Sequence, residues 1–128
     1  MKAKRGFSKN VLASILDVKI LGIRAGTKPN RVIGIWAVVV EGRVFVRSWS
    51  LKPRSWYRTF LEERNGAVRI GNKEVPVRSH PVRGKKLNDA MDRAYAAKYT
   101  TKPNEKYVKG FATPKRRATT LALVRWQA

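Results

Sequence analysis

The feature that most constrains the fold is an apolar run of eight residues, Ile33 to Val40, followed at once by a turn signal. Alternate side chains of an extended strand point to opposite faces, so this run presents apolar groups on both faces. A strand of this kind must be buried on both faces. Glu41-Gly42 then predicts a tight turn, and residues 43–49 return with alternating apolar side chains. The sequence therefore predicts an antiparallel hairpin over residues 31–49.

The periodicity of apolar residues and the positions of Gly, Pro and capping residues predict the remaining helices and strands. Helices are expected over residues 8–16 with Ser8 as N-cap, over 54–64 with Asn65-Gly66 as the stop, and over 85–99. Strands are expected over residues 18–25, 67–70, 74–79 and 119–126. Pro76 cannot donate to a ladder, which predicts an edge strand or a bulge there. Residues 102–117 are polar and interrupted by proline, and are expected to form a loop with one helical turn near 106–108.

These elements predict a mainly β fold with some α-helix (α+β). Strands joined by tight turns are antiparallel, so we expect a small antiparallel barrel of about six strands with helices packed outside. The length of 128 residues fits one domain over residues 1–128, with the basic residues 1–6 as a flexible arm. No apolar run approaches the roughly 20 residues that span a bilayer. The start lacks the apolar core of a secretory signal, so a cytoplasmic location is expected.

Charge predicts an anionic partner, and residue types exclude several chemistries. Lys and Arg number 29 against 8 Asp and Glu, a formal net charge of +21, spread along the chain. Such a field favours phosphate-bearing partners, although a general bias toward basic proteins is the alternative. The chain has no cysteine and one histidine, His80, which excludes disulfides and zinc–thiolate sites. Nucleophilic catalysis and metal binding therefore lack support, and no Gly-rich phosphate loop is present.

One segment, residues 46–58, contains the residue types that form phosphate-binding sites. It joins the end of a strand to the start of a helix, where free N–H groups and the helix dipole favour anions. Its basic side chains include Arg47, Lys52 and Arg54, and its hydroxyls are those of Ser48, Ser50 and Ser55. Trp36 and Trp49 could offer an aromatic wall to a flat ring. The alternative, equally compatible with composition, is a capped helix with solvent-facing arginines and core tryptophans.

The pattern of residues 40–49, followed by residues 54–58 and by Val68-Arg69-Ile70, resembles the flavin-binding split-barrel superfamily. That group includes the pyridoxamine-phosphate oxidases and the deazaflavin-dependent nitroreductases. Within it, the chain is most similar to domain-of-unknown-function family 2255, a bacterial family. Leu87-Asn88-Asp89, residues 94–99 and the Arg-Ala-Thr-Thr before the last strand add to this resemblance, which covers roughly residues 7–126.

The resemblance implies a dimeric split barrel that holds a flavin-type cofactor, FMN or a deazaflavin, by its phosphate. Carried onto this chain, the implied phosphate ligands are Arg47, Ser48, Ser50 and Arg54, with Lys52 nearby, and the residues lining the ring are Trp36 and Trp49. The leading hypothesis is a cofactor-binding protein that acts as a reductase by hydride transfer. The alternatives are a non-enzymatic nucleic-acid-binding module, whose non-specific binding would be weak, and a cofactor-free interaction domain.

Overall fold

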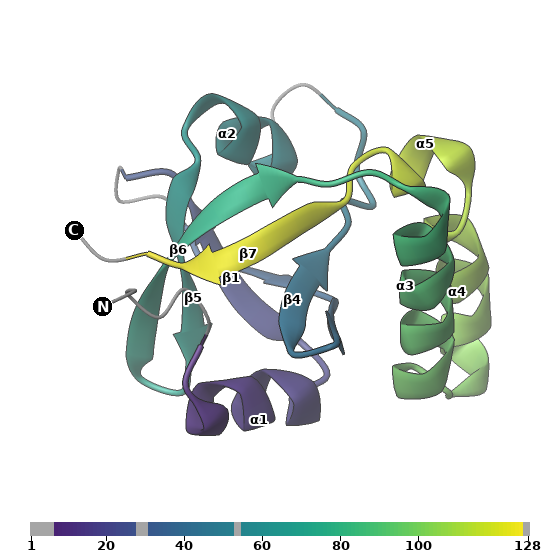
Figure 1. The fold of residues 1–128 in the computed structure, drawn as a ribbon, viewed down its shortest axis with the longest axis horizontal. Helices are drawn as coiled ribbons and strands as arrows, with labels where there is room; N and C mark the ends of the chain where they lie inside the picture. The colour runs from purple at the N-terminus through teal and green to yellow at the C-terminus, as the bar shows by residue number, and fades with distance from the viewer. Residues whose placement is uncertain (1–6, 28–30, 53–54, 127–128) are drawn as a thin grey trace.

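A computed structural model of the protein describes residues 7–27, 31–52 and 55–126. Within this part of the chain, seven strands form one antiparallel sheet in the order β2-β1-β5-β6-β7-β4-β3. Their bounds are β1 Leu21–Ala25, β2 Ile33–Ile35, β3 Ala37–Val40, β4 Arg43–Val46, β5 Asn65–Ile70, β6 Lys73–Pro81 and β7 Leu121–Arg125. The sheet curls into a nearly closed barrel (Figure 1), which confirms the predicted class with seven strands in place of about six.

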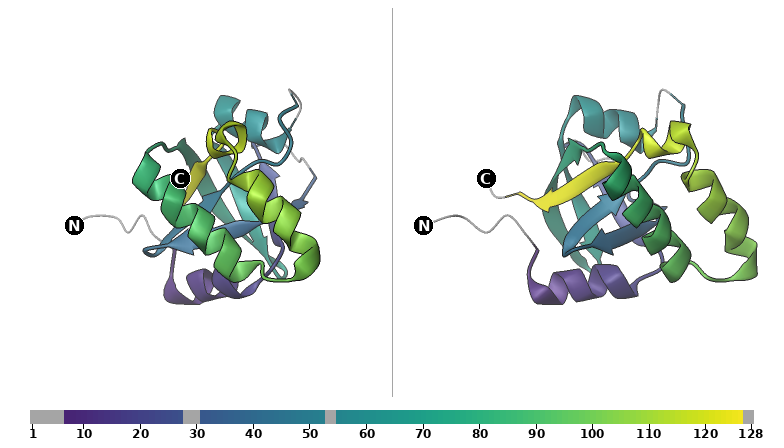
Figure 2. Two further views of the ribbon diagram at one scale, coloured as in Figure 1. Left: turned by 90° about the vertical axis from the view of Figure 1, so that its right-hand side faces the viewer. Right: turned by 45° about the vertical axis from the view of Figure 1, so that its right-hand side comes forward.

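The helices lie outside the barrel, as predicted. Their bounds are α1 Lys9–Asp17, α2 Trp56–Glu62, α3 Lys85–Lys98, the 3-10 helix η1 Lys102–Asn104, α4 Glu105–Phe111 and α5 Pro114–Arg117. Helices α1 and α2 lie at opposite ends of the barrel, and α3 and α4 lie side by side against one flank (Figures 1 and 2). No helix among the described residues is long and apolar enough to cross a membrane.

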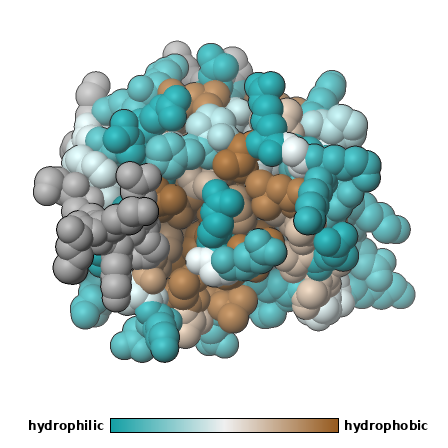
Figure 3. Space-filling model, viewed as in Figure 1, coloured by the Kyte–Doolittle hydropathy of each residue, from teal (hydrophilic) through white to brown (hydrophobic). Residues whose placement is uncertain are grey.

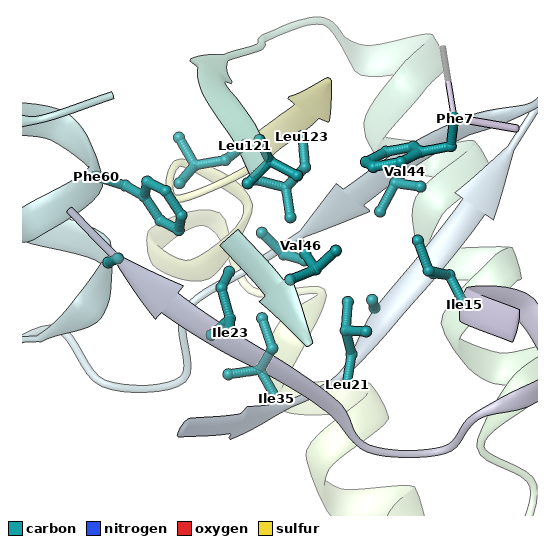
Figure 4. Packing of buried hydrophobic residues seen from close by; sticks show 14 residues of the cluster. Phe7, Ile15, Leu21, Ile23, Ile35, Val44, Val46, Phe60, Leu121 and Leu123 are labelled. Carbon is teal, nitrogen blue, oxygen red and sulfur yellow. The ribbon is translucent and has the colours of Figure 1, made fainter. Parts of the chain in front are cut away.

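Two apolar clusters lie on opposite faces of strands β3 and β4. The cluster inside the barrel includes Ile23, Val46, Phe60 and Leu123 (Figure 4). The outer cluster fills the space between the barrel and α3 and α4; it comprises Val38, Phe45, Met91, Tyr95, Tyr99, Phe111 and Ala122. In β4 the side chains therefore alternate between two cores. The burial on both faces that was predicted for residues 33–40 is confirmed for β3 and is wrong for β2, where Ile33 is 37% exposed.

The predicted strand over residues 31–40 is in fact two strands, separated at Trp36. Strand β2 pairs with β1, whereas β3 pairs with β4, so the continuous hairpin over 31–49 is wrong outside residues 37–46. The turn itself is confirmed, because Glu41 and Gly42 have φ of 51° and 75°, the positive values that a tight I′ hairpin turn requires. The break at Trp36 lets the chain leave one part of the barrel wall and enter another.

The structure corrects two predictions for the second hairpin, one made from Asn65-Gly66 and the other from Pro76. Asn65-Gly66 does not end α2; both residues lie in β5, and α2 ends at Glu62. Gly66 is needed for close packing, since a Cβ there would lie 2.5 Å from the carbonyl oxygen of Arg24. Pro76 lies in β6, an interior strand between β5 and β7. Proline is tolerated at this position because the residue opposite it, Trp126, lies just beyond the end of β7. The ladder between the two strands therefore does not need the N–H that proline lacks.

The expected loop over residues 102–117 is largely helical, containing η1, α4 and α5. Pro103 and Pro114 occupy the first turns of η1 and α5, where proline costs no hydrogen bond because those N–H groups have no partner within the helix. The two prolines therefore begin helices and do not interrupt them. Residues 1–6, expected to form a flexible arm, lie outside the described residues, and the single-domain expectation stays a prediction.

Figure 3 shows hydrophilic side chains around much of one face of the molecule, with apolar side chains gathered near its middle. Exposed large apolar residues also occur elsewhere: Ile20, Val32 and Ile33 are 54%, 38% and 37% exposed. They lie on and beside β2, which is an edge strand of the sheet. The molecule thus combines a strongly basic composition with local apolar surface near β2.

Candidate functional site: an aromatic cavity

A cavity of ≈ 490 Å³ opens between β2, the end of β4 and helix α4. Five aromatic side chains line it: Trp36, Trp49, Trp56, Tyr107 and Phe111. Backbone and side chains of β2, including Gly34 and Ile35, complete the apolar wall. Ligand pockets in proteins are typically of this size, mostly apolar, with a few polar groups that fix orientation. The arrangement therefore suits a flat, largely apolar ring system.

Trp36 is held rigidly at one end of the cavity. Its ring stacks on that of Tyr99, with centroids 3.8 Å apart and planes 4° apart. The Tyr99 hydroxyl in turn donates to the carbonyl oxygen of Lys19 at 2.7 Å. One face of the indole is thus occupied by protein, while Trp36 also lines the cavity. Such a fixed ring provides a stacking surface without losing side-chain freedom on binding.

Trp49 also lines the cavity, and protein groups fix its position as well. The Arg116 guanidinium lies 3.9 Å from the Trp49 ring centroid, and Arg116 Nε donates to the Trp49 carbonyl oxygen at 3.0 Å. Tyr107 and Phe111 contact the ring edge-on, at centroid distances of 5.1 and 5.4 Å. The backbone of Gly110 passes directly against the indole, leaving no space for a Cβ atom. Trp49 is nevertheless 40% exposed, so part of its ring remains accessible.

Gly110→Ala should displace Trp49 from the cavity wall. The added methyl group would overlap two atoms of the indole ring, so the ring must move. We expect near-native secondary structure by circular dichroism, a changed tryptophan emission spectrum and weaker binding of any ligand that stacks there. The control is Ala112→Gly, which adds no atoms in the same helical segment. Unchanged tryptophan emission in the Gly110→Ala variant would contradict this packing.

Arg47, a predicted phosphate ligand, lines the cavity, and its guanidinium group is hydrogen-bonded to other protein groups. Its side chain is 0% exposed. Its Nε donates to Thr120 Oγ1 at 3.0 Å, and its Nη1 donates to Asp92 Oδ1 at 2.6 Å and to the Phe111 carbonyl at 3.0 Å. Its Nη2 donates to both the carbonyl and the side-chain oxygen of Asn88. All five guanidinium N–H donors are therefore used within the protein, which leaves none for a phosphate.

A second arginine extends this network along α3. Arg117 pairs with Asp92 and, at 3.0 Å, with Asp89. Lys85 also pairs with Asp89 at 2.8 Å, and the two cations lower the pKa of that carboxyl, Lys85 first. The network ties the ends of β4 and β7 to α3, to α5 and to α4, the helix that carries Tyr107 and Phe111. Its role in the site is to position the aromatic wall.

The other predicted phosphate ligands are distributed unevenly. Ser48 is buried, and its hydroxyl donates to the Ser50 carbonyl at 2.6 Å. Ser50 lines the cavity, and its hydroxyl oxygen accepts from the Lys52 backbone N–H at 3.2 Å. Lys52 is exposed, and Arg54 lies outside the described residues. Ser50 is thus the predicted hydroxyl that reaches the cavity, while phosphate binding by this segment stays a prediction.

Sequence reasoning missed the residues that α4 and α5 contribute to the site. Tyr107, Phe111 and Arg116 fall in the segment expected to be a loop. Tyr107 and Phe111 are four residues apart, a spacing that places them on one helix face, and this signal was available. No sequence signal indicated the contact of Arg116 with Trp49, because the two residues are 67 positions apart. No cluster of three His, Cys, Asp or Glu residues that could hold a metal ion occurs in the described ranges.

Residues 10–123 match the sequence model of a family described as "Uncharacterized protein conserved in bacteria", DUF2255. Among curated proteins, no sequence matches. Similar solved structures include an F420-H2-dependent reductase, 20% identical with a TM-score of 0.56, covering 86% of this chain and 96% of that one. A FAD-binding protein from Mesorhizobium loti is 10% identical with a TM-score of 0.53, covering 94% and 91%. A protein described as a domain-swapped dimer is 20% identical with a TM-score of 0.55, covering 86% and 82%. At these identities the likeness concerns the fold.

Proposed function

Because the chain belongs to domain-of-unknown-function family 2255 and folds as a split barrel of the flavin-binding type, we propose that it binds a flavin-type cofactor, FMN or a deazaflavin. The observation that carries the proposal is the aromatic cavity, whose lining includes the fixed rings of Trp36 and Trp49. Its apolar walls and its volume of ≈ 490 Å³ fit a tricyclic ring. The structural relatives named for F420, itself a deazaflavin, and for FAD support the same class.

The cofactor phosphate would lie at the Trp49 end of the cavity. Arg116 is fixed there through its Nε, and Ser50 brings a hydroxyl to the same wall. Lys52 follows Ser50 directly and is exposed, so its ammonium group can reach an anion at the rim. In this proposal Arg116 takes the role that the family resemblance implied for Arg47. Guanidinium groups suit this role because they bind phosphate through two parallel N–H donors.

The activity we infer is that of a reductase in which the bound cofactor supplies hydride transfer. The chain's own residues would bind and orient the ring and exclude water from it. Helices η1 and α4 cover the cavity through Asn104, Tyr107 and Phe111, which gives the site its apolar cover. We further propose a cytoplasmic homodimer, with the apolar surface of Ile20, Val32 and Ile33 beside β2 at the interface. Sedimentation velocity measures the oligomeric state directly.

Titration with FMN and with a deazaflavin tests the proposal. We expect quenching of cofactor fluorescence with micromolar or tighter affinity. A single phosphate engages few cations, so the slope of log affinity against log salt should be near one or two in magnitude. Nucleic acid, the alternative partner suggested by the net charge of +21, should bind with a steep slope and weakly at physiological salt.

The opposite result would favour the nucleic-acid alternative. If neither cofactor class binds while RNA or DNA binds selectively at submicromolar concentration and physiological salt, the cofactor proposal is wrong. Absorbance spectra of the purified protein provide an independent check, because a retained flavin or deazaflavin absorbs in the visible or near-ultraviolet range. A protein that binds neither ligand class would match a cofactor-free interaction domain.

A further inference from the structure

A second, smaller cavity of ≈ 200 Å³ adjoins the Trp36 end of the aromatic cavity. The two cavities share three lining residues: Ile20, Trp36 and Asn104. Whereas the larger cavity is lined mainly by aromatic groups, the smaller one is lined by two lysines, Lys19 and Lys98, together with hydroxyl-bearing residues. A molecule with a flat apolar part and a polar end could therefore occupy both at once.

Backbone carbonyls fix the two ammonium groups of the second cavity. Lys98 Nζ donates to the carbonyl oxygens of Ile15 at 3.0 Å and Ala37 at 2.7 Å, which leaves one of its three hydrogens. Lys19 Nζ donates to the carbonyl oxygen of Lys98 at 2.7 Å, which leaves two. Both groups also lie near the Tyr99 ring, 5.4 Å from its centroid for Lys98 and 5.9 Å for Lys19. The cavity thus has two positioned cations with donors to spare.

No carboxylate within the described ranges forms an ion pair with either lysine. The carbonyls orient the ammonium groups without cancelling their formal charge. Desolvation, then repulsion from Lys19, lowers the pKa of Lys98 to about 8, although Asp17 acts in the opposite direction. An anion bound here would relieve the repulsion between these two cations, with which no carboxylate of the described ranges forms an ion pair.

We propose that this second cavity is an anion subsite that takes the carboxylate or phosphate of a substrate whose flat ring stacks on the cofactor ring in the aromatic cavity. The proposal rests on the proposed function, because it assumes that the cofactor ring occupies the aromatic cavity. It adds the chemical class of the substrate. The Trp49 end already provides Arg116, Ser50 and Lys52 for the cofactor phosphate, so the anion at the Trp36 end belongs to the substrate. The substrate class is accordingly a small aromatic or conjugated acid.

Two pairs of ligands, each differing in one anionic group, test the proposal. FMN and riboflavin differ in a phosphate, and 4-nitrobenzoate and nitrobenzene differ in a carboxylate. The variants are Lys19→Gln, at the second cavity, and Lys52→Gln, an exposed lysine at the Trp49 end that loses the same charge. Lys19 is exposed, so its replacement should leave the fold intact, and circular dichroism verifies this. Nitro-compound affinities are measured with and without saturating flavin.

We expect Lys19→Gln to reduce the preference for 4-nitrobenzoate over nitrobenzene about tenfold, the order expected for a charge-assisted hydrogen bond, and to leave the preference for FMN over riboflavin unchanged. Lys52→Gln should do the reverse. If Lys19→Gln lowers the FMN preference instead, the subsite is retained and its anion belongs to the cofactor. If Lys19→Gln changes neither preference, or if both variants act alike, the subsite is wrong.

Failure of the proposed function gives a different pattern. If riboflavin, FMN and deazaflavin all fail to bind the unmodified protein, the cofactor assignment falls. The nitro-compound preference measured without flavin still reports on the anion subsite. The two inferences can therefore be rejected separately.

The pH dependence of the same preference provides a second readout. Lys98 faces Lys19, Asp17 and Tyr99, and burial raises the pKa of Tyr99 to about 12, so the tyrosine stays neutral. Lys98 is protonated below its pKa of about 8 and loses its charge above it. The preference for 4-nitrobenzoate over nitrobenzene should fall between pH 7 and pH 9. A preference that stays flat over this range would exclude Lys98 from the subsite.

Discussion

Replacing Arg47 with methionine is expected to lower the free energy of unfolding by about 3–5 kcal/mol, the usual cost of removing one partner from a buried ion pair. The variant leaves the oxygens of Asp92, Asn88 and Phe111 without the donors that satisfy them. Arg117 still pairs with Asp92, which should place the loss nearer the lower figure. Urea denaturation followed by circular dichroism measures the effect.

Arg93→Met is the matched control for this prediction. Arg93 lies on the same helix, α3, and is exposed, so its replacement should change the free energy of unfolding by less than about 0.5 kcal/mol. Arg47→Lys retains the charge but cannot supply five donors in a fork, and should be intermediate. A stable Arg47→Met variant that lost only cofactor binding would restore Arg47 to the predicted set of phosphate ligands.

Trp36→Ala is expected to weaken flavin or deazaflavin binding by roughly 10- to 100-fold, in line with the 1–3 kcal/mol that one aromatic stacking partner contributes. The substitution removes a ring that lines both cavities and exposes the face of Tyr99 on which it stacks. Fluorescence titration in the folded variant, at fixed salt, measures the loss. Nucleic-acid binding should change much less, since it depends on dispersed cations.

Trp126→Ala provides the control for Trp36→Ala. Trp126 is also partly buried, but it follows β7 and bonds through its backbone N–H to the Pro76 carbonyl, and it does not line the cavity. Its replacement should leave cofactor affinity within about twofold. Equal losses from both variants would indicate general destabilisation, and no loss from Trp36→Ala would place the ring binding elsewhere.

Local sequence was enough to predict the elements that depend on neighbouring residues. Ser8 caps α1 as expected, its hydroxyl accepting from the Val11 N–H, because capping involves only residues three apart. Glu41-Gly42 forms the predicted turn because its positive φ angles are a local requirement. The alternation of Val44, Phe45 and Val46 correctly indicated a strand, since side chains of a strand alternate whatever it packs against, and the structure adds that apolar clusters cover both of its faces.

Predictions were wrong where the structural role of a residue depends on segments that are distant in the sequence. Pro76 indicated an edge strand or a bulge, yet β6 is interior, because only the length of β7 decides whether an N–H is needed at that position. The break at Trp36 has no local signal, because it arises where β2 and β3 pair with different strands. Pro103 and Pro114 suggested a loop, although proline equally begins a helix.

The same distinction between local sequence and tertiary structure applies to the candidate site. The sequence by itself determined the family pattern, the basic charge and the antiparallel barrel class, because these depend on composition and on short-range pattern. Only the tertiary structure decided that Arg47 is used internally and that Arg116 lies on Trp49, since both depend on contacts more than 40 residues apart. A cation in a sequence shows that charge is available, whereas burial and hydrogen bonding decide whether that charge faces a ligand or the protein itself.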